Sequence, residues 1–97
     1  MSDVFNALSS PVRRQILSML KSRDMTAGQI ADGLDVGKST LSGHLNVLKN
    51  ADLASTRRNG TTITYSLNTS VVEDMLSLIA NLFTNDKKGE SNDVEDL

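Results

Sequence analysis

The chain has 97 residues, which is enough for one domain with a modest hydrophobic core. It has no cysteine, which excludes disulfides and thiolate metal sites, and its single histidine cannot bind zinc unless several carboxylates converge on it. With no signal peptide and no apolar run near the ~20 residues of a membrane span, we expect a cytoplasmic protein without membrane insertion.

Two short helices are expected at the start of the chain. Residues 3–8 place Val4, Phe5 and Leu8 on one side of the first helix. Ser10 and Pro11 then predict a second helix, because serine is a favoured cap and the missing N–H of a first-position proline costs nothing. The apolar face of the second helix consists of Val12, Ile16, Leu17 and Leu20.

Arg13 and Arg14 stand in the first turn of that second helix, where the helix dipole disfavours cations. Two interpretations are open. Solvated side chains are the favoured one, and an arginine that holds a carboxylate or a phosphate is the alternative.

The next segment has the spacing of a helix-turn-helix. Thr26 and Gln29 match a capping box, which predicts a short helix. Its inward face consists of Ile30, Ala31 and Leu34. Residues 35–37 form a tight connection, and a glycine in such a turn is typical of a helix-turn-helix. Gly37 also serves as the N-cap of the helix that follows.

Residues 38–50 predict a helix with two different faces. Leu41, Leu45 and Leu48 form a narrow apolar stripe at ~100° per residue. The opposite face is small, polar and uncharged, with lysines at its border, which suits close approach to base edges and phosphates in a DNA major groove. The residues of this helix expected to contact DNA are Lys38, Ser39, Thr40, Ser42, Gly43 and Asn46.

His44 lies at the edge of the leucine stripe, about 60° from Leu41 around the helix axis. We expect a packed, hydrogen-bonded histidine rather than a base-reading or metal-binding one, because histidine is often half-buried. For Asn46, contact with DNA and simple solvation stay equally open.

After residue 52 the apolar period changes from helical to two. Residues 53–58 and 61–67 are expected to be strands, joined by Asn-Gly at 59–60, a strong hairpin signal. We interpret the hairpin as a wing whose basic tip, Arg57 and Arg58, reaches phosphates or the minor groove. The alternative is a tip kept soluble by its charge. The inward-facing residues of the second strand are Ile63, Tyr65 and Leu67.

A capping box from Ser70 to Glu73 predicts a last helix that runs to about Thr84. Its apolar residues cover an arc of about 160°, wider than the ~100° stripe that one core needs. The same helix of a second subunit, assisted by the first helix, best explains the surplus; the alternative is burial between two parts of one domain. The expected dimer-interface residues are Val4, Phe5, Leu8, Val72, Met75, Leu76, Ile79 and Phe83.

The net charge of −2 is distributed unevenly along the chain. Residues 85–97 carry five acidic and two basic side chains without an apolar period, so we expect a disordered acidic tail. Residues 36–67 carry four basic side chains and one acidic, a net charge of +3 where DNA contact is expected. Residues 1–84 are therefore expected to form one DNA-binding and dimerisation domain.

The chain contains, in order, the segments FNALSSPVRRQIL at 5–17, TAGQIA at 26–31, STLSGHL at 39–45, RNG at 58–60 and YSL at 65–67. As a set they resemble the ArsR family of bacterial winged helix-turn-helix repressors. The resemblance implies a mainly α fold with a small β-hairpin wing (α+β), and a homodimer, built from the first and last helices, on a palindromic operator. It also implies that Lys38, Ser39 and Ser42 touch DNA, whereas Gly43 departs from the histidine, arginine or glutamine often found at its position.

The resemblance does not extend to the metal sites of this family. Metal-sensing members carry cysteines at positions that here hold Thr26 and Gly28. Others use aspartate and histidine on the final helix, which here has Glu73 and Asp74 but no histidine. The chain therefore resembles the metal-independent, SdpR-like branch, and we expect neither a metal nor another cofactor.

We expect a dimeric winged helix-turn-helix repressor whose partners are double-stranded operator DNA and a second copy of itself. Half-sites would lie ~34–36 Å apart, about one turn of B-DNA, and a bound dimer would occlude the promoter. The competing hypothesis is a protein-interaction module that acts through its apolar C-terminal helix. A sequestering protein or a small-molecule inducer stays open as a further partner. No nucleophile–base pair, phosphate loop or carboxylate dyad indicates an enzyme.

Overall fold

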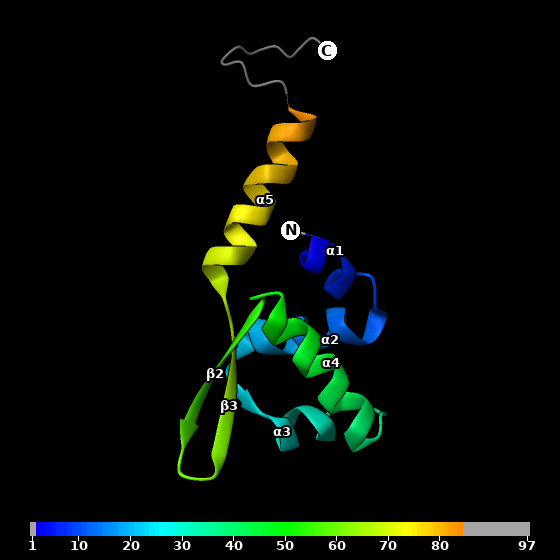
Figure 1. Cartoon of the computed structure of the whole chain (residues 1–97), viewed down its shortest axis with the longest axis vertical. Coiled ribbons are helices and arrows are strands. Elements are labelled where there is room, and N and C mark those ends of the chain that lie inside the picture. The colour runs from blue at the N-terminus through cyan, green and yellow to red at the C-terminus, as the bar shows by residue number, and fades with distance from the viewer. Residues whose placement is uncertain (1, 85–97) are drawn as a thin grey trace.

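The computed structural model describes residues 2–84, so the expected acidic tail at 85–97 lies outside the described residues. The elements in chain order are α1 (Ser2–Leu8), α2 (Pro11–Ser22), β1 (Met25–Thr26), α3 (Ala27–Asp32), α4 (Lys38–Asn50), β2 (Ala54–Asn59), β3 (Thr62–Leu67) and α5 (Thr69–Phe83). The β2–β3 hairpin and α5 extend toward opposite ends of the molecule, and α1 to α4 lie together to one side of them (Figure 1). The predicted fold, mainly helical with a small antiparallel wing, is confirmed.

Three of the predicted helix starts are confirmed. The Ser10 hydroxyl accepts a hydrogen bond from the Arg13 amide, and Pro11 is the first residue of α2. The Thr26 capping box is complete, since the Thr26 hydroxyl accepts from the Gln29 amide and the Gln29 side chain accepts from the Thr26 amide. Gly37 is the N-cap of α4.

The predicted capping box at Ser70 is wrong. The N-cap of α5 is Asn68, without a side-chain capping bond, so Ser70 already lies in the first turn. The reason is a tertiary contact: the Asn68 amide donates to the Leu53 carbonyl at 2.9 Å, which ties the junction of β3 and α5 to the junction of α4 and β2. The chain therefore turns into the helix directly after β3.

The sheet has three antiparallel strands in the order β1-β3-β2, one more than the expected hairpin. In the added strand, Met25 pairs with Tyr65 and Thr26 with Thr64. A two-residue strand beside a capping box has no alternating pattern of its own, so the sequence gives no signal for it. β3 is consequently the central strand, and Tyr65 and Leu67 on it pack against the core.

The hairpin turn lies one residue later than predicted. Asn59 is still in β2 and pairs with Thr62, so the two turn residues are Gly60 and Thr61. Gly60 has φ +67°, and a glycine at the first central position is the requirement of a type II′ turn. The glycine was found correctly, but its neighbour in the turn is Thr61 rather than Asn59.

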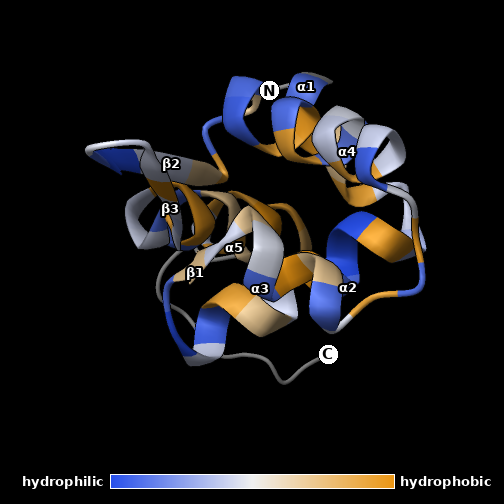
Figure 2. Ribbon diagram, turned by 90° about the horizontal axis from the view of Figure 1, so that it is seen from below, coloured by the Kyte–Doolittle hydropathy of each residue, from blue (hydrophilic) through white to orange (hydrophobic). Residues whose placement is uncertain are grey.

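The core lies where the helices face one another and the sheet. Its largest fully buried side chains are Ile16 from α2, Ile30 from α3, Leu48 from α4 and Leu53 from the segment before β2. Coloured by hydropathy, the hydrophobic residues of α2, α3 and α4 gather on the sides that face the interior (Figure 2). Among residues 2–84, no helix has the length and apolar character needed to span a membrane.

α4 ends in a Schellman motif built on Asp52. The Leu53 amide donates to the Leu48 carbonyl and the Asp52 amide to the Lys49 carbonyl, both at 3.0 Å. Asp52 has φ 61°, in the left-handed region where glycine is usual. Leu53 and Leu48 are both fully buried and form the hydrophobic contact that accompanies this motif. The helix therefore stops at a defined residue without a glycine.

Candidate nucleic-acid interface

α4 is held from one side only. Leu41, Leu45 and Leu48 are buried, as their spacing predicted, and α4 packs against α1, α2, α3 and β2. The opposite side is open to solvent. The residues predicted to contact DNA all lie on this exposed side: Lys38, Ser39, Thr40, Ser42, Gly43 and Asn46.

Gly43 lies in the middle of this exposed side. A Cβ placed on Gly43 would meet no other atom within 4 Å, so packing within the chain does not require a glycine there. A glycine inside a helix costs roughly 0.5–1 kcal/mol relative to alanine. The protein therefore accepts a loss of stability at the one position of α4 where the backbone itself is bare, which suits close approach of another surface.

A brace from Arg13 ties α4 to the N-terminal helices. The Arg13 guanidinium donates to the Ala7 carbonyl at 2.8 Å and to the Asn6 carbonyl at 2.9 Å. Its third bond, 3.1 Å long, joins Nη1 to Nδ1 of His44 on α4. Since a guanidinium can only donate, His44 accepts on Nδ1 and carries its proton on Nε2. The expectation of a half-buried, hydrogen-bonded His44 is confirmed.

Neither interpretation of the two arginines included bonds to the chain's own carbonyls, although Arg14 is exposed, as the favoured interpretation expected. Arg14 donates to the Leu8 carbonyl at 2.7 Å, so Arg13 and Arg14 together satisfy three consecutive carbonyls at the end of α1. The last carbonyls of a helix lack partners within it, and cations stabilise that end. A sequence signal existed: two arginines follow the end of a helix within six residues.

The two wing arginines point to opposite faces of the hairpin. Arg58 pairs with Ile63 and Arg57 with Thr64, and successive side chains of a strand alternate between faces. Arg57 lies 4.0 Å from the carboxylate of Asp24, a solvent-exposed ion pair. Both arginines are exposed, as predicted, but they do not form one cluster.

The residues predicted for a dimer interface divide into three groups. Val4 and Met75 are buried in the core of the chain itself, so a second subunit would gain little area from them. Leu8, Val72 and Ile79 are half-buried and pack against that core. Large exposed hydrophobic side chains remain on the outside, with exposed fractions of 50% for Phe5, 58% for Leu76, 37% for Leu78, 71% for Leu82 and 83% for Phe83. Leu78 and Leu82 were not in the predicted set.

Within residues 2–84, no group of three or more histidine, cysteine, aspartate or glutamate side chains is arranged to hold a metal ion. Glu73 and Asp74 are exposed on α5. Thr26 and Gly28 lie at the start of α3, where Thr26 is used as the helix cap. Within the described part of the chain, these four positions therefore form no ligand cluster.

α4 is anchored on one side and exposes small polar groups on the other. It follows a short turn and precedes a basic hairpin. This combination defines a winged helix-turn-helix protein. The profile described as "Bacterial regulatory protein, arsR family" matches residues 10–56. The chain is 48% identical over 81 residues to the transcriptional repressor SdpR of Bacillus subtilis (strain 168), covering 84% of this chain and 90% of that protein. The chain belongs to the ArsR family of bacterial transcriptional regulators.

Two solved structures agree with this assignment. HlyU from Vibrio cholerae has a TM-score of 0.69 at 30% identity and covers 84% of this chain and 89% of that chain. The same protein is named a transcriptional activator. An ArsR-like transcriptional regulator from Rhodococcus sp. RHA1 has a TM-score of 0.77 at 27% identity, over 84% of this chain and 76% of that chain. The fold is thus that of ArsR-type DNA-binding regulators.

Proposed function

We propose that this regulator is a homodimeric repressor that inserts α4 of each subunit into the major groove of a palindromic operator. The observation that carries the proposal is the exposed side of α4, which has short hydroxyl and amide groups, a bare glycine and a lysine at the N-terminal end. Such groups meet base edges, and the lysine meets phosphate. The buried leucines hold the helix so that this side faces outward.

The apolar surface of α5 supports the dimer. Leu76, Leu82 and Phe83 are mostly exposed, and an exposed apolar surface of this kind marks an interaction site. Burial of each such side chain contributes about 1.5–3 kcal/mol. We propose that α5 of two subunits pack together with Phe5 from α1 at their edge, and that residues 1–84 form this DNA-binding and dimerisation domain.

Repression rather than activation is proposed from similarity. Identity to the repressor SdpR is 48%, against 31% to the activator HlyU. A dimer seated across a promoter blocks the polymerase without any further activity. This role places the protein in the cytoplasm.

We propose in addition that no metal controls DNA binding through the cysteine or histidine sites of metal-sensing relatives. The chain has no cysteine, and its single histidine already accepts a hydrogen bond from Arg13. Operator affinity should therefore be unchanged by zinc, copper or arsenite at micromolar concentrations and by chelators.

The first test is selection of bound sequences from genomic DNA, followed by titration of the selected site and of an unrelated duplex. Replacement of Ser39 and Ser42 together by alanine should reduce the ratio of the two affinities at least about thirtyfold, because each base contact contributes about 1–3 kcal/mol of discrimination. Ser70→Ala with Ser77→Ala on α5 is the matched control. An unchanged ratio would remove α4 as the reader.

A salt series separates the main proposal from its alternative, a protein-interaction module acting through α5. Binding that neutralises phosphates weakens steeply as salt rises, whereas association of apolar surfaces does not. A flat salt dependence, with no preferred duplex, would favour the interaction module.

A further inference from the structure

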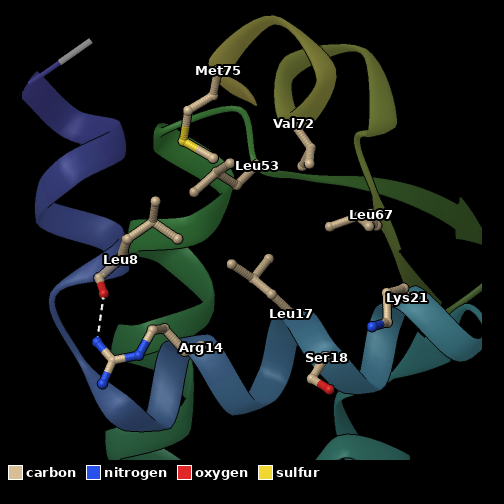
Figure 3. Close-up of a pocket in the computed structure, with 9 residues that line it drawn as sticks. All are labelled: Leu8, Arg14, Leu17, Ser18, Lys21, Leu53, Leu67, Val72 and Met75. Carbon is tan, nitrogen blue, oxygen red and sulfur yellow. Dashed lines mark hydrogen bonds between the residues drawn. The ribbon is translucent and has the colours of Figure 1, made fainter. Parts of the chain in front are cut away.

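A cavity of about 290 Å³ opens between α2 and α5. Its walls are apolar and come from four parts of the chain that are distant in sequence. They are formed by Leu8, Leu17, Leu53, Leu67, Val72 and Met75, whose side chains point toward a common space (Figure 3). A volume near 300 Å³ is at the lower end of the range for small-molecule sites.

The rim of this cavity is basic. Arg14, Ser18 and Lys21 lie along the face of α2 that borders it, spaced four and three residues apart, which places them on one side of a helix. The lining contains two basic residues and no acidic one. Across residues 2–84 the structure has a single ion pair, between Arg57 and Asp24, so neither rim cation is neutralised by a described carboxylate.

We propose that this cavity binds a small anionic amphiphile, with its apolar tail between Leu17 and Met75 and its carboxylate or phosphate head against Lys21, Ser18 and Arg14. An apolar side chain from a second copy of the chain could occupy the cavity, but it would carry no negative charge to pair with Arg14 and Lys21. The volume corresponds to about ten water-sized units of roughly 30 Å³ each. Octanoate, with ten non-hydrogen atoms, therefore has the right size.

Occupancy of the cavity bears on the position of α5. Only Val71, Val72, Met75 and Ile79 of α5 pack against the core, and two of these four line the cavity. A ligand would stand between α2 and the first turns of α5, and so would set the angle at which α5 leaves the domain. This step rests on the proposed function: because α5 is the proposed dimer helix, a change in its angle changes the spacing of the two α4 helices and hence operator affinity.

Binding is tested on the full chain with octanoate, and with 1-octanol and octylammonium as neutral and cationic ligands of the same chain length. Titration calorimetry should give a dissociation constant below about 1 mM for octanoate, and values at least tenfold weaker for the other two. Met75 lines the cavity whereas Met19 and Met25 do not, so of these three methyl resonances only that of Met75 should shift in a spectrum of methyl-labelled methionines.

Lys21→Gln should weaken octanoate binding about tenfold, the effect of one charge-assisted hydrogen bond. Arg23→Gln is the matched control, because Arg23 is an exposed basic residue next to the same helix end but outside the cavity. Leu17→Trp should fill the cavity and abolish binding; Lys21→Gln, at an exposed position, keeps the test valid if the tryptophan variant does not fold.

The site would be overturned by equal affinity for octanoate and octanol, by a Met75 resonance that does not move, or by equal effects of Lys21→Gln and Arg23→Gln. Binding that disappears as the protein dimerises would show that a second copy covers the cavity, which also overturns it. Octanoate should change operator affinity several-fold; binding without that change would overturn the regulatory step. Operator titration without octanoate tests the proposed function separately.

Discussion

α4 and α5 are the two longest helices of the described chain, with 13 and 15 residues, and they are held in opposite ways. α4 buries three leucines and exposes short polar groups. α5 buries only Met75 and exposes large apolar side chains, including Leu82 and Phe83. An exposed helix face is thus not one kind of surface: α4 is suited to a hydrated, charged partner and α5 to an apolar one.

The difference also concerns rigidity. α4 contacts α1, α2, α3 and β2 along its buried side and is tied by the Arg13 brace, whereas α5 contacts the core through its first two to three turns and then extends away from it (Figure 1). A helix that contacts DNA bases, as proposed for α4, requires a fixed position. A dimer helix, as proposed for α5, requires a fixed position only once the second subunit binds. The following predictions test this contrast.

The largest effect is expected at the apolar face of α5. Leu76→Glu should raise the dimer dissociation constant at least about 100-fold, because an unpaired charge in an apolar interface costs several kcal/mol. Sedimentation velocity over a concentration series measures it. Ser77→Glu, an exposed polar position next to Leu76, should leave the constant almost unchanged. If both variants stay dimeric, the interface lies elsewhere and the contrast with α4 loses its meaning.

The next effect is expected at the brace of α4. Arg13→Ala removes three hydrogen bonds and should lower the free energy of unfolding by about 2–3 kcal/mol. Arg14→Ala removes one exposed bond and should cost less than about 1 kcal/mol. Urea titrations of both variants decide this. Equal losses would mean that Arg13 does not anchor α4 more strongly than an ordinary surface contact.

A smaller effect on DNA binding is expected at the two arginines of the β2–β3 hairpin. Arg58→Ala should reduce the salt dependence of DNA binding by about one ion and weaken all duplexes alike. Arg57→Ala should have a smaller effect, because Arg57 is already beside Asp24. Asp24→Ala should accordingly strengthen binding in the presence of Arg57 and have no effect in its absence. An identical loss for both arginines would contradict the assignment of separate faces.

The smallest change compares a position within α4 with one just after its C-terminal end. Gly43→Ala should stabilise the fold by about 0.5–1 kcal/mol but weaken operator binding several-fold, since its methyl group enters the space against DNA. Asp52→Gly should stabilise by a similar amount, because it relieves a left-handed backbone, and should leave operator binding unchanged. Thermal melts and operator titrations report both. If Gly43→Ala binds the operator normally, close approach at Gly43 is excluded.

Local patterns predicted most of the fold. The leucine stripe identified α4 and its buried side, Pro11 and the Thr26 capping box marked helix starts, and the Asn-Gly pair marked the hairpin to within one residue. These features succeed because a repeat of 3.6 or 2, or a cap, is encoded by residues within four positions of one another.

The features that the sequence did not predict depend on distant partners. The bond between Arg13 and His44 spans 31 positions, and the amide of Asn68 that starts α5 is fixed by the carbonyl of Leu53. The strand β1 exists only because β3 lies beside it. The cavity at the base of α5 joins six apolar residues from four segments, which no single periodicity contains. Positions on the exposed side of α4 were predictable, but DNA contact itself stays a prediction.

The single residue between β3 and α5 has a consequence for how this chain can vary. Leu67 is the last residue of β3, Asn68 follows, and α5 begins at Thr69. One inserted residue there would rotate the helix about its axis by about 100° relative to the sheet. The apolar face of α5 would then turn away from the core. A change of length would displace every residue of α5 at once, so relatives of this sequence should keep the number of residues from Tyr65 to Met75.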